Sequence, residues 1–178
     1  MAVQVIDMLM QEHQVILKRL GEFQSYDADQ LAEAPELTAD FIAFIRDYAD
    51  HYHHAKEEEI LFPWMLQKNP QFKYGPIAVM LSEHNTGREL AERLSQQLEA
   101  LQGAGTPEQR LGCAAAIHKT AADLCQLLQQ HIHKEDNVLY QFAENIDAQT
   151  GDGDASMLEP CMEVNQKLEE LARNHLPV

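Results

Sequence analysis

The sequence contains the same two-helix pattern twice, and this internal repeat restricts the fold more than any other feature. The block KEEEILFP at positions 56–63 aligns without a gap with KEDNVLYQ at positions 134–141, and the two agree in chemistry at their first six or seven positions. A histidine stands four residues before the aligned glutamate of each block, and a Glu-His pair lies upstream of each block: His53 and His131, Glu12-His13 and Glu83-His84. The chain therefore repeats one unit, a segment with Glu-His followed by a segment with His-x-x-x-Glu.

Apolar residues recur every three or four positions over long stretches, which predicts helices throughout the chain. Glycine, proline and Asn69-Pro70 separate the stretches, and positions 27–34 form a polar connection. The expected helices run from about Val3 to Tyr26, from Pro35 to about Lys68, from Gly75-Pro76 to the loop at Gly103, from Thr106 to about Ile146, and from about Met157 to Asn174 with Pro160 in its first turn. We predict one all-α domain over residues 1–178, an up-down four-helix bundle (about 3–146) with an additional C-terminal helix (about 157–174).

The repeated histidines and glutamates lie on the apolar stripes of their predicted helices. His13, for example, continues the stripe of Ile6 and Leu9, and the stripe of the fourth helix runs through His131 and Glu135 to Val138 and Phe142. His54 and Glu58 have the same spacing as His53 and Glu57, but only the latter pair matches His131 and Glu135. The repeat therefore selects His53 and Glu57, and the bundle is expected to bury four imidazoles and two carboxylates together.

Buried carboxylates cost several kcal/mol unless they are paired, and metal ions supply the partners for such a set. A four-residue step along a helix returns to nearly the same face, so that His53 and Glu57 can both reach one centre. Four imidazoles and two carboxylates suit two metals, each with two imidazoles and with Glu57 and Glu135 as bridges. Nitrogen and oxygen donors without thiolates favour iron, manganese or zinc. The count also leaves coordination positions open for a small ligand.

Taken together, these motifs resemble the hemerythrin-like family, also known as the HHE cation-binding domain, over residues 5 to 145. The resemblance implies a four-helix bundle around a non-haem di-iron centre with a bridging oxo or hydroxo group. Position by position, it implies His13 and His53 on one iron, His84 and His131 on the other, and Glu57 and Glu135 as bridges. Animal oxygen-carrying hemerythrins use five histidines, whereas the repeat supplies four, and the pattern is closer to bacterial single-domain members.

The resemblance implies a protein that binds dioxygen, nitric oxide or peroxide at an open iron position, in sensing or in a stress response. Two alternatives use the same ligands. One is an enzyme of nitric oxide or peroxide reduction or of iron-sulphur cluster repair, and the other is iron storage or homeostasis. Zinc or manganese can replace iron in such sites. The sequence does not separate these functions, and it names no catalytic residue beyond the metal ligands.

Charge and composition restrict the partners and the compartment. The formal charge is -16 over 178 residues, which disfavours nucleic acids and anionic membranes as partners. No apolar run is long enough to span a membrane, and three cysteines without a close pair suit a reducing cytoplasm. We therefore expect a cytoplasmic protein. The resemblance implies that its main partner is a small diatomic or peroxide ligand. The sequence leaves open a redox partner protein and a homo-oligomer.

The remaining polar residues are expected to have ordinary roles. Glu12 and Glu83 lie about 100° around the helix from the metal-facing stripe, which favours exposed charges. Glu58 and Glu59 are expected to point outward, and Tyr48 and Tyr52 to pack rather than to donate a hydrogen bond to Glu57. The other histidines are expected on the solvent side or beside the core, with His54 as an alternative ligand: His51, His54, His118, His133 and His175.

Overall fold

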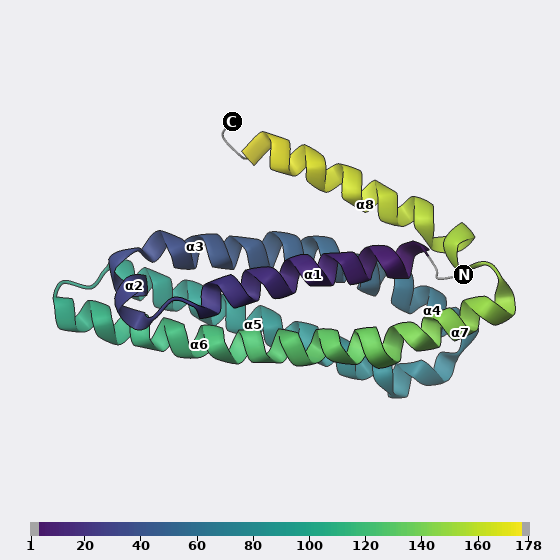
Figure 1. Ribbon diagram of the computed structural model, residues 1–178, viewed down its shortest axis with the longest axis horizontal. Helices are drawn as coiled ribbons and strands as arrows, with labels where there is room; N and C mark the ends of the chain where they lie inside the picture. The colour runs from purple at the N-terminus through teal and green to yellow at the C-terminus, as the bar shows by residue number, and fades with distance from the viewer. Residues whose placement is uncertain (1–3, 176–178) are drawn as a thin grey trace.

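The computed structural model describes the backbone of residues 4–175 and the side chains of residues 4–154 and 156–166, and it contains helices and no β-strand over that range. Figure 1 shows long helices packed side by side and a last helix that leaves them at an angle. The elements are α1 (Gln4–Gln24), α2 (Ala28–Glu33), α3 (Pro35–Phe44), η1 (Ile45–His54), η2 (Glu57–Leu61), α4 (Phe62–Lys68), η3 (Pro70–Tyr74), α5 (Pro76–Gln102), α6 (Pro107–Lys134), η4 (Glu135–Leu139), α7 (Tyr140–Thr150) and α8 (Gly153–His175). The all-α prediction is confirmed.

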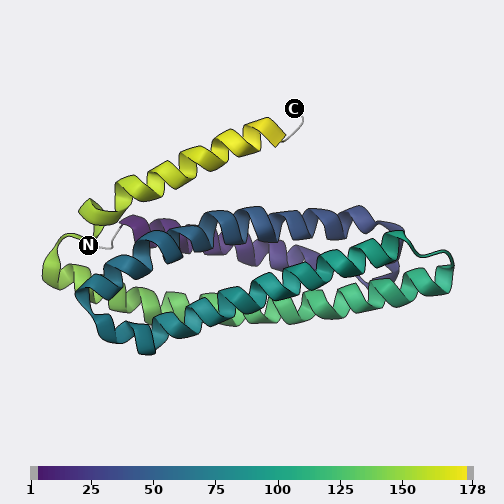
Figure 2. The ribbon, with the colours of Figure 1, turned by 180° about the vertical axis from the view of Figure 1, so that it is seen from behind.

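The helices follow one another up and down the bundle. The first arm is α1, the second joins α3, η1, η2 and α4, the third is α5, and the fourth joins α6, η4 and α7. Figure 2 shows the bundle from behind, with the second and third arms in front. The bundle closes because α5 contacts α6 and α3, while α1 contacts α6 and α3. C-terminal helix α8 crosses one side of the bundle and contacts α1, η1, η2, α4 and α7.

Most helix ends occur where the sequence predicts them. Thr106 accepts a hydrogen bond from the backbone N–H of Gln109, whose side chain accepts one from the Thr106 N–H, and Pro107 occupies the first turn of α6. Pro35 likewise occupies the first turn of α3. The prediction of a polar connection at 27–34 is wrong in one respect, because this segment contains helix α2. A capping box of Asp27 and Gln30 begins that helix, and Leu31 is fully buried on it.

The C-terminal helix begins earlier than the sequence predicts. Gly151 adopts a left-handed conformation with φ of 69°, which ends α7 and turns the chain. The carboxylate of Asp147 then accepts a hydrogen bond from the N–H of Gly153 over 2.6 Å. Helix α8 therefore begins at Gly153 rather than near Met157, and Pro160 lies inside it rather than in its first turn.

Three segments of the second and fourth arms are π-helical, and two of them occupy equivalent positions in the repeat. The N–H of Phe62 donates to the carbonyl of Glu57, and the N–H of Tyr140 donates to the carbonyl of Glu135, five residues earlier in each case. Such a wide turn adds one residue to the helix and shifts the residues that follow it. The predicted continuation of the core stripe through Val138 and Phe142 is therefore wrong, because these side chains are 48% and 41% exposed.

The residues that replace them in the core are Leu139 and Tyr140, together with their repeat equivalents Leu61 and Phe62. They belong to one of two buried apolar clusters. One cluster includes Leu9, Leu61, Met80 and Leu139, and the other includes Ile16, Ala49, Ala91 and Leu128. Along each arm the repeated histidine lies between a residue of one cluster and a residue of the other. The bundle thus encloses a polar layer between two apolar layers.

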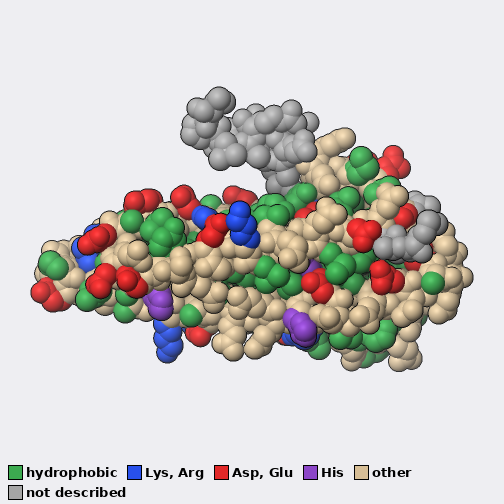
Figure 3. Space-filling model, viewed as in Figure 1, with side chains coloured by type: hydrophobic (Ala, Val, Ile, Leu, Met, Phe, Trp, Pro, Cys, Tyr) green, Lys and Arg blue, Asp and Glu red, His purple; other side chains and the backbone are tan. Residues whose placement is uncertain are grey.

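The surface agrees with the acidic composition. Acidic side chains are spread over the face shown in Figure 3, among few basic ones. Within residues 4–175, no helix has the length and apolar character needed to cross a membrane.

Candidate metal centre

The polar layer contains the six side chains that the repeat singles out. All four arms contribute: His13 comes from α1, His53 from η1, Glu57 from η2, His84 from α5, His131 from α6 and Glu135 from η4. Each of the six is at most 1% exposed. The structure therefore brings together all the predicted ligand residues in the interior of the bundle.

The imidazoles form two pairs with similar geometry. The ring centroids of His13 and His53 are 4.5 Å apart with an interplanar angle of 59°, and those of His84 and His131 are 4.7 Å apart with an angle of 69°. In both pairs the tilted rings are compatible with two imidazoles bound to one ion. The Nε2 atoms of His84 and His131 are only 3.0 Å apart. Two such nitrogens approach this closely only when a proton or a cation lies between their lone pairs.

Each glutamate lies between one imidazole of each pair. Oε2 of Glu57 is 3.8 Å from Nε2 of His53 and 3.4 Å from Nε2 of His84. Oε2 of Glu135 is 3.3 Å from Nε2 of His13 and 3.2 Å from Nε2 of His131. This crossed arrangement is the one that two bridging carboxylates require.

Several atoms of the layer have no hydrogen-bond partner among the described residues. They are Nε2 of His53, Oε2 of Glu57 and both carboxylate oxygens of Glu135. Buried polar atoms are almost always partnered, and a buried carboxylate without a partner is especially costly. Potential ligand atoms also lie within 4.8 Å of one another in two sets that share Glu57: His13, His53, Glu57 and Glu135, and His54, Glu57, His84 and His131. The donors and their unpaired atoms therefore fit a pair of metal ions.

A second layer of carboxylates orients the imidazoles. The Nδ1 atom of each histidine is hydrogen-bonded to an acid: His13 to Asp136 at 2.7 Å, His53 to Glu12 at 2.9 Å, His84 to Glu58 at 2.6 Å and His131 to Glu83 at 3.0 Å. A donated Nδ1–H leaves the Nε2 lone pair free for a metal, and such outer partners fix the ring and raise its basicity. The expectations of exposed Glu12, Glu83 and Glu58 are therefore wrong: Glu12 is buried, the other two are half-buried, and all three accept from histidines.

This second layer obeys the repeat. Glu12 and Glu83, which precede the Glu-His histidines, are hydrogen-bonded to His53 and His131 of their own halves. Glu58 and Asp136, which follow Glu57 and Glu135, are hydrogen-bonded to His84 and His13 of the other half. The lysines that precede Glu57 and Glu135 are equivalent too, because Lys56 pairs with Glu12 and Lys134 pairs with Glu83. The sequence shows this signal as Lys-Glu-Glu and Lys-Glu-Asp in the aligned blocks.

The two lysines differ in burial. Lys56 is fully buried, lies 3.5 Å from the centroid of the Tyr52 ring and donates a hydrogen bond to Asn165 of α8. The side chain of Lys134 is 38% exposed. Helix α8 therefore covers the outer layer of one half of the site and not that of the other.

The protonation of the imidazoles follows from their acidic neighbours. Burial opposes a charge on His13, but the neighbouring carboxylates of Asp136 and Glu135 outweigh it and raise the pKa of His13 to about 10. Burial likewise opposes a charge on His84, and Glu57 and Glu58 raise its pKa to about 9. Without a metal, protons on these imidazoles compensate the buried carboxylates.

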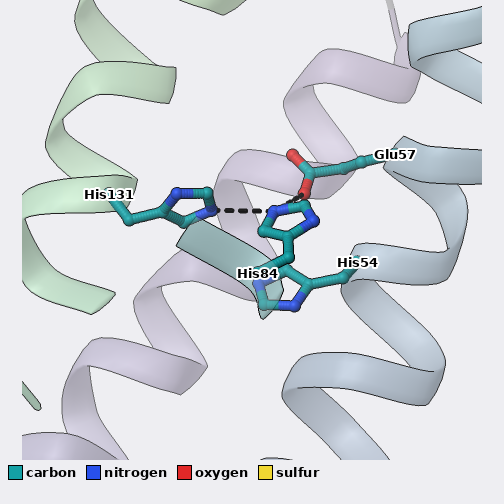
Figure 4. A group of neighbouring side chains, drawn as sticks. All are labelled: His54, Glu57, His84 and His131. Atoms are coloured by element: carbon teal, nitrogen blue, oxygen red, sulfur yellow. Dashed lines mark hydrogen bonds and ion pairs between the residues drawn. The ribbon is translucent and has the colours of Figure 1, made fainter. Parts of the chain in front are cut away.

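His54, expected on the solvent side or beside the core or as an alternative ligand, is buried beside the site. It is 5% exposed, and its ring lies flat on that of His84, with centroids 3.8 Å apart and an interplanar angle of 13°. Figure 4 shows His54 below His84, with Glu57 above the two rings and His131 to one side of His84. In this stack the two nearly parallel ring planes do not meet at one ion, although His54 also offers a ligand atom within 4.8 Å of those of Glu57, His84 and His131. Burial lowers the pKa of His54 to about 4.

Tyr140 is a further site residue that the sequence reasoning missed. Its hydroxyl donates to Oε1 of Glu57 over 2.6 Å, and its ring is stacked on His13 with centroids 5.5 Å apart. Phe62, its repeat equivalent, is stacked on His84. The alignment of Phe62 with Tyr140 in the repeated blocks was the available signal. Of the other histidines, His51, His118 and His133 are exposed as predicted, while the side chain of His175 lies outside the described residues.

Comparison with known proteins gives two matches of different extent. The model of the hemerythrin HHE cation-binding domain matches residues 4–143. Iron-sulfur cluster repair proteins YtfE of Salmonella paratyphi B, Salmonella newport and Salmonella heidelberg are each 33% identical to the chain over 88 residues. That segment covers 49% of this chain and 39% of each relative, so the chain matches well under half of their length. No solved structure gives a significant match.

The family match spans all six side chains of the buried layer and all four arms that carry them. It agrees with the two adjoining sets of histidine and glutamate ligand atoms. On the fold, the site and this match together, the chain belongs to the hemerythrin HHE cation-binding family.

Proposed function

We propose that the chain is a non-haem di-iron protein that binds a small ligand, dioxygen, nitric oxide or peroxide, in sensing or in a stress response. The observation that carries this proposal is the buried layer in which four imidazoles meet two carboxylates, with Oε2 of Glu57 and both oxygens of Glu135 lacking a hydrogen-bond partner among the described residues. Iron is favoured together with manganese and zinc by nitrogen and oxygen donors. His13 and His53 would hold one ion, His84 and His131 the other, and Glu57 and Glu135 would bridge them.

When bound, a pair of iron ions supplies redox chemistry and positions at which a small ligand can bind. The protein residues provide the setting for it. The outer acids Glu12, Glu58, Glu83 and Asp136 hold the imidazole Nδ1–H groups and keep the Nε2 atoms aimed inward. Tyr140 holds one oxygen of Glu57 by its hydroxyl and leaves the other free. The apolar clusters on both sides exclude bulk water from the layer.

The test is to load the metal-free protein anaerobically with ferrous iron and to measure bound iron and the absorption spectrum. We expect about two irons per chain, and reversible spectral changes with nitric oxide or dioxygen. The variants His53→Ala and His131→Ala should each lose full occupancy because each removes one imidazole of a pair. His133→Ala is the matched control, since His133 is exposed on the same helix as His131. Full occupancy in His53→Ala and His131→Ala would refute the assignment of these ligands.

The comparisons support a second candidate, a role in the repair of iron-sulphur clusters. The relatives that match 88 residues of the chain are named as repair proteins, although the match covers 39% of their length. The test is transfer of iron from the loaded protein to an apo protein that accepts a cluster, with an iron chelator of equal affinity as a control. Repair predicts faster cluster formation than the chelator gives. A rate equal to that with the chelator would count against repair and leave ligand binding as the function.

A further inference from the structure

A cavity of about 400 Å³ reaches the candidate metal centre from one side of the bundle. It lies between η1, α5 and α6, and its lining includes His54 and, among the six proposed metal ligands, His84 alone. The rest of its inner wall is apolar and is formed by Ile45, Ala49, Gly87, Ala91, Leu124 and Leu128. Through His84, the cavity approaches the metal position that His84 would share with His131, and it has no lining residue from the position of His13 and His53.

The arginines that line the cavity are each paired with acidic side chains. Arg46 is paired with Glu92 at 2.7 Å. Arg88 is paired with Asp50 at 2.7 Å and also with Glu58 at 2.7 Å. An anion entering the cavity would gain no unpaired cation and would lose its water in an apolar channel. An uncharged diatomic molecule pays no such penalty, so the lining favours dioxygen or nitric oxide over an anionic ligand.

The repeat shows that the two metal positions are not equivalent. The residue that corresponds to His54 in the second half is Ile132, which is buried. Beside His13, the stacked aromatic ring is Tyr140, whose hydroxyl is held by Glu57. Beside His84, the equivalent stacking residue is Phe62, and His54 covers the ring from closer range. His54 thus gives the cavity a polar wall beside His84. Its repeat equivalent Ile132 is apolar and provides no such wall at the metal position of His13 and His53.

We propose that this cavity is the path by which an uncharged diatomic ligand reaches the metal position of His84 and His131, and that His54 is the positioning residue in its wall. The inference rests on the proposed function. Nδ1 of His54 is buried without a hydrogen-bond partner among the described residues and lies 3.5 Å from Oδ1 of Asp50. The flat stack on His84 makes His54 a wall of the cavity and not a metal ligand.

Gly87 offers a way to block the cavity without disturbing the ligands. A Cβ atom added at Gly87 would meet only Cδ1 of Leu124 at 3.9 Å, which is an ordinary contact. The side chain of Gly87→Leu would therefore extend into the cavity. Gly112→Leu is the matched control, because Gly112 is exposed in helix α6 and an added Cβ meets nothing within 4 Å. Ala91→Leu narrows the same cavity from the next turn of α5 and is a second, independent variant.

The experiment measures the association rate of nitric oxide with the reduced, iron-loaded protein by stopped flow, with iron content and circular dichroism measured alongside. Gly87→Leu and Ala91→Leu should retain two irons and bind nitric oxide about tenfold more slowly or worse, while Gly112→Leu should match the wild type. Wild-type rates in the cavity variants would overturn the entry path and leave the proposed function intact. If Gly87→Leu loses iron, the rate in Ala91→Leu decides. If the wild type binds no nitric oxide, the same rates are measured with dioxygen, and absence of binding of both gases would overturn this proposal.

The role of His54 is tested separately with His54→Leu. We expect this variant to retain two irons per chain and to shift the N–O stretching frequency of bound nitric oxide, because a polar ring beside the ligand becomes apolar. His118→Leu, an exposed histidine on α6, is the control and should leave the frequency unchanged. Loss of one iron per chain in His54→Leu would make His54 a metal ligand and overturn its role as a wall. An unchanged frequency would show that His54 does not face the ligand.

Discussion

Tyr140 donates its hydroxyl to Oε1 of Glu57 over 2.6 Å, and this buried hydrogen bond joins the second half of the repeat to the first. The contact exists because the π-helical turn of η4 moves Tyr140 into the core and Val138 out of it. It leaves Oε2 of Glu57 as the free oxygen, directed at His53 and His84. One phenol therefore fixes which carboxylate oxygen is available to a metal.

We predict that Tyr140→Phe lowers the free energy of unfolding of the metal-free protein by about 1–3 kcal/mol, because it leaves a buried carboxylate oxygen without a donor. Chemical denaturation monitored by circular dichroism measures this change. Iron content should remain at two per chain, since Tyr140 is not a proposed ligand. Tyr48→Phe is the control, because Tyr48 is half-buried against Phe44 and should change stability little. Equal effects of the two variants would contradict the role given to Tyr140.

The bundle and the burial of the six repeated histidines and glutamates in one layer could be predicted from sequence because both depend on short-range regularities. Proline and capping residues determine where α3 and α6 begin, and the three- and four-residue period determines which helix face is buried. The repeat resolved the choice between His53 and His54. That choice needed no structure, because the second half contains only one histidine at the corresponding positions, His131.

The features of the site that could not be predicted depend either on the residue that a π-helical turn adds or on contacts between helices of different arms. A π-helical turn after Glu135 shifts the helix face by one residue, and a regular period placed Val138 and Phe142 in the core instead of Leu139 and Tyr140. The acids Glu12 and Glu83 lie off the apolar stripe, and only the packing of neighbouring arms brings them to His53 and His131. The repeat leaves open the position of His54, on the solvent side or beside the core, because it has no second histidine to match it.

The outer acids give a second prediction. Glu58→Gln should weaken metal binding about 10–100-fold, because Glu58 accepts from Nδ1 of His84 over 2.6 Å and such partners orient the metal-binding nitrogen. Competition with a metal chelator of known affinity measures the change. Glu59→Gln is the matched control, since Glu59 is the next residue of the same helix and is exposed. Identical affinities for Glu58→Gln and the wild type would show that the hydrogen bond to His84 does not support the site.

The two repeat-related lysines provide a third prediction. Lys56→Met should destabilise the metal-free protein by about 3–5 kcal/mol, because Lys56 is fully buried and its loss leaves Glu12 without its cation. Lys134→Met is the internal control. It removes the equivalent pair with Glu83, but the lysine side chain is 38% exposed, and such a pair contributes about 1 kcal/mol or less. Denaturant unfolding compares the two variants, and similar losses would argue against the special burial of Lys56.

The raised pKa values of His13 and His84 give a final prediction about pH. Both groups bind protons more tightly in the folded, metal-free protein than in the unfolded chain, since their pKa values rise from 6.5 to about 10 and about 9. Their contribution to stability is therefore complete below pH 6.5 and is lost as the pH rises through 9 and 10. The free energy of unfolding of the metal-free protein should fall across this window.

Metal binding requires the same two imidazoles to be neutral, so loading at pH 7 should release about two protons per chain from His13 and His84. Titration calorimetry in buffers of different ionisation enthalpy measures this number. The stability of the loaded protein should also be less sensitive to pH between 7 and 10 than that of the metal-free protein, because the ions replace the protons that compensate Glu57 and Glu135. Release of no protons at pH 7 would mean that His13 and His84 are already neutral, and that the buried carboxylates are compensated in another way.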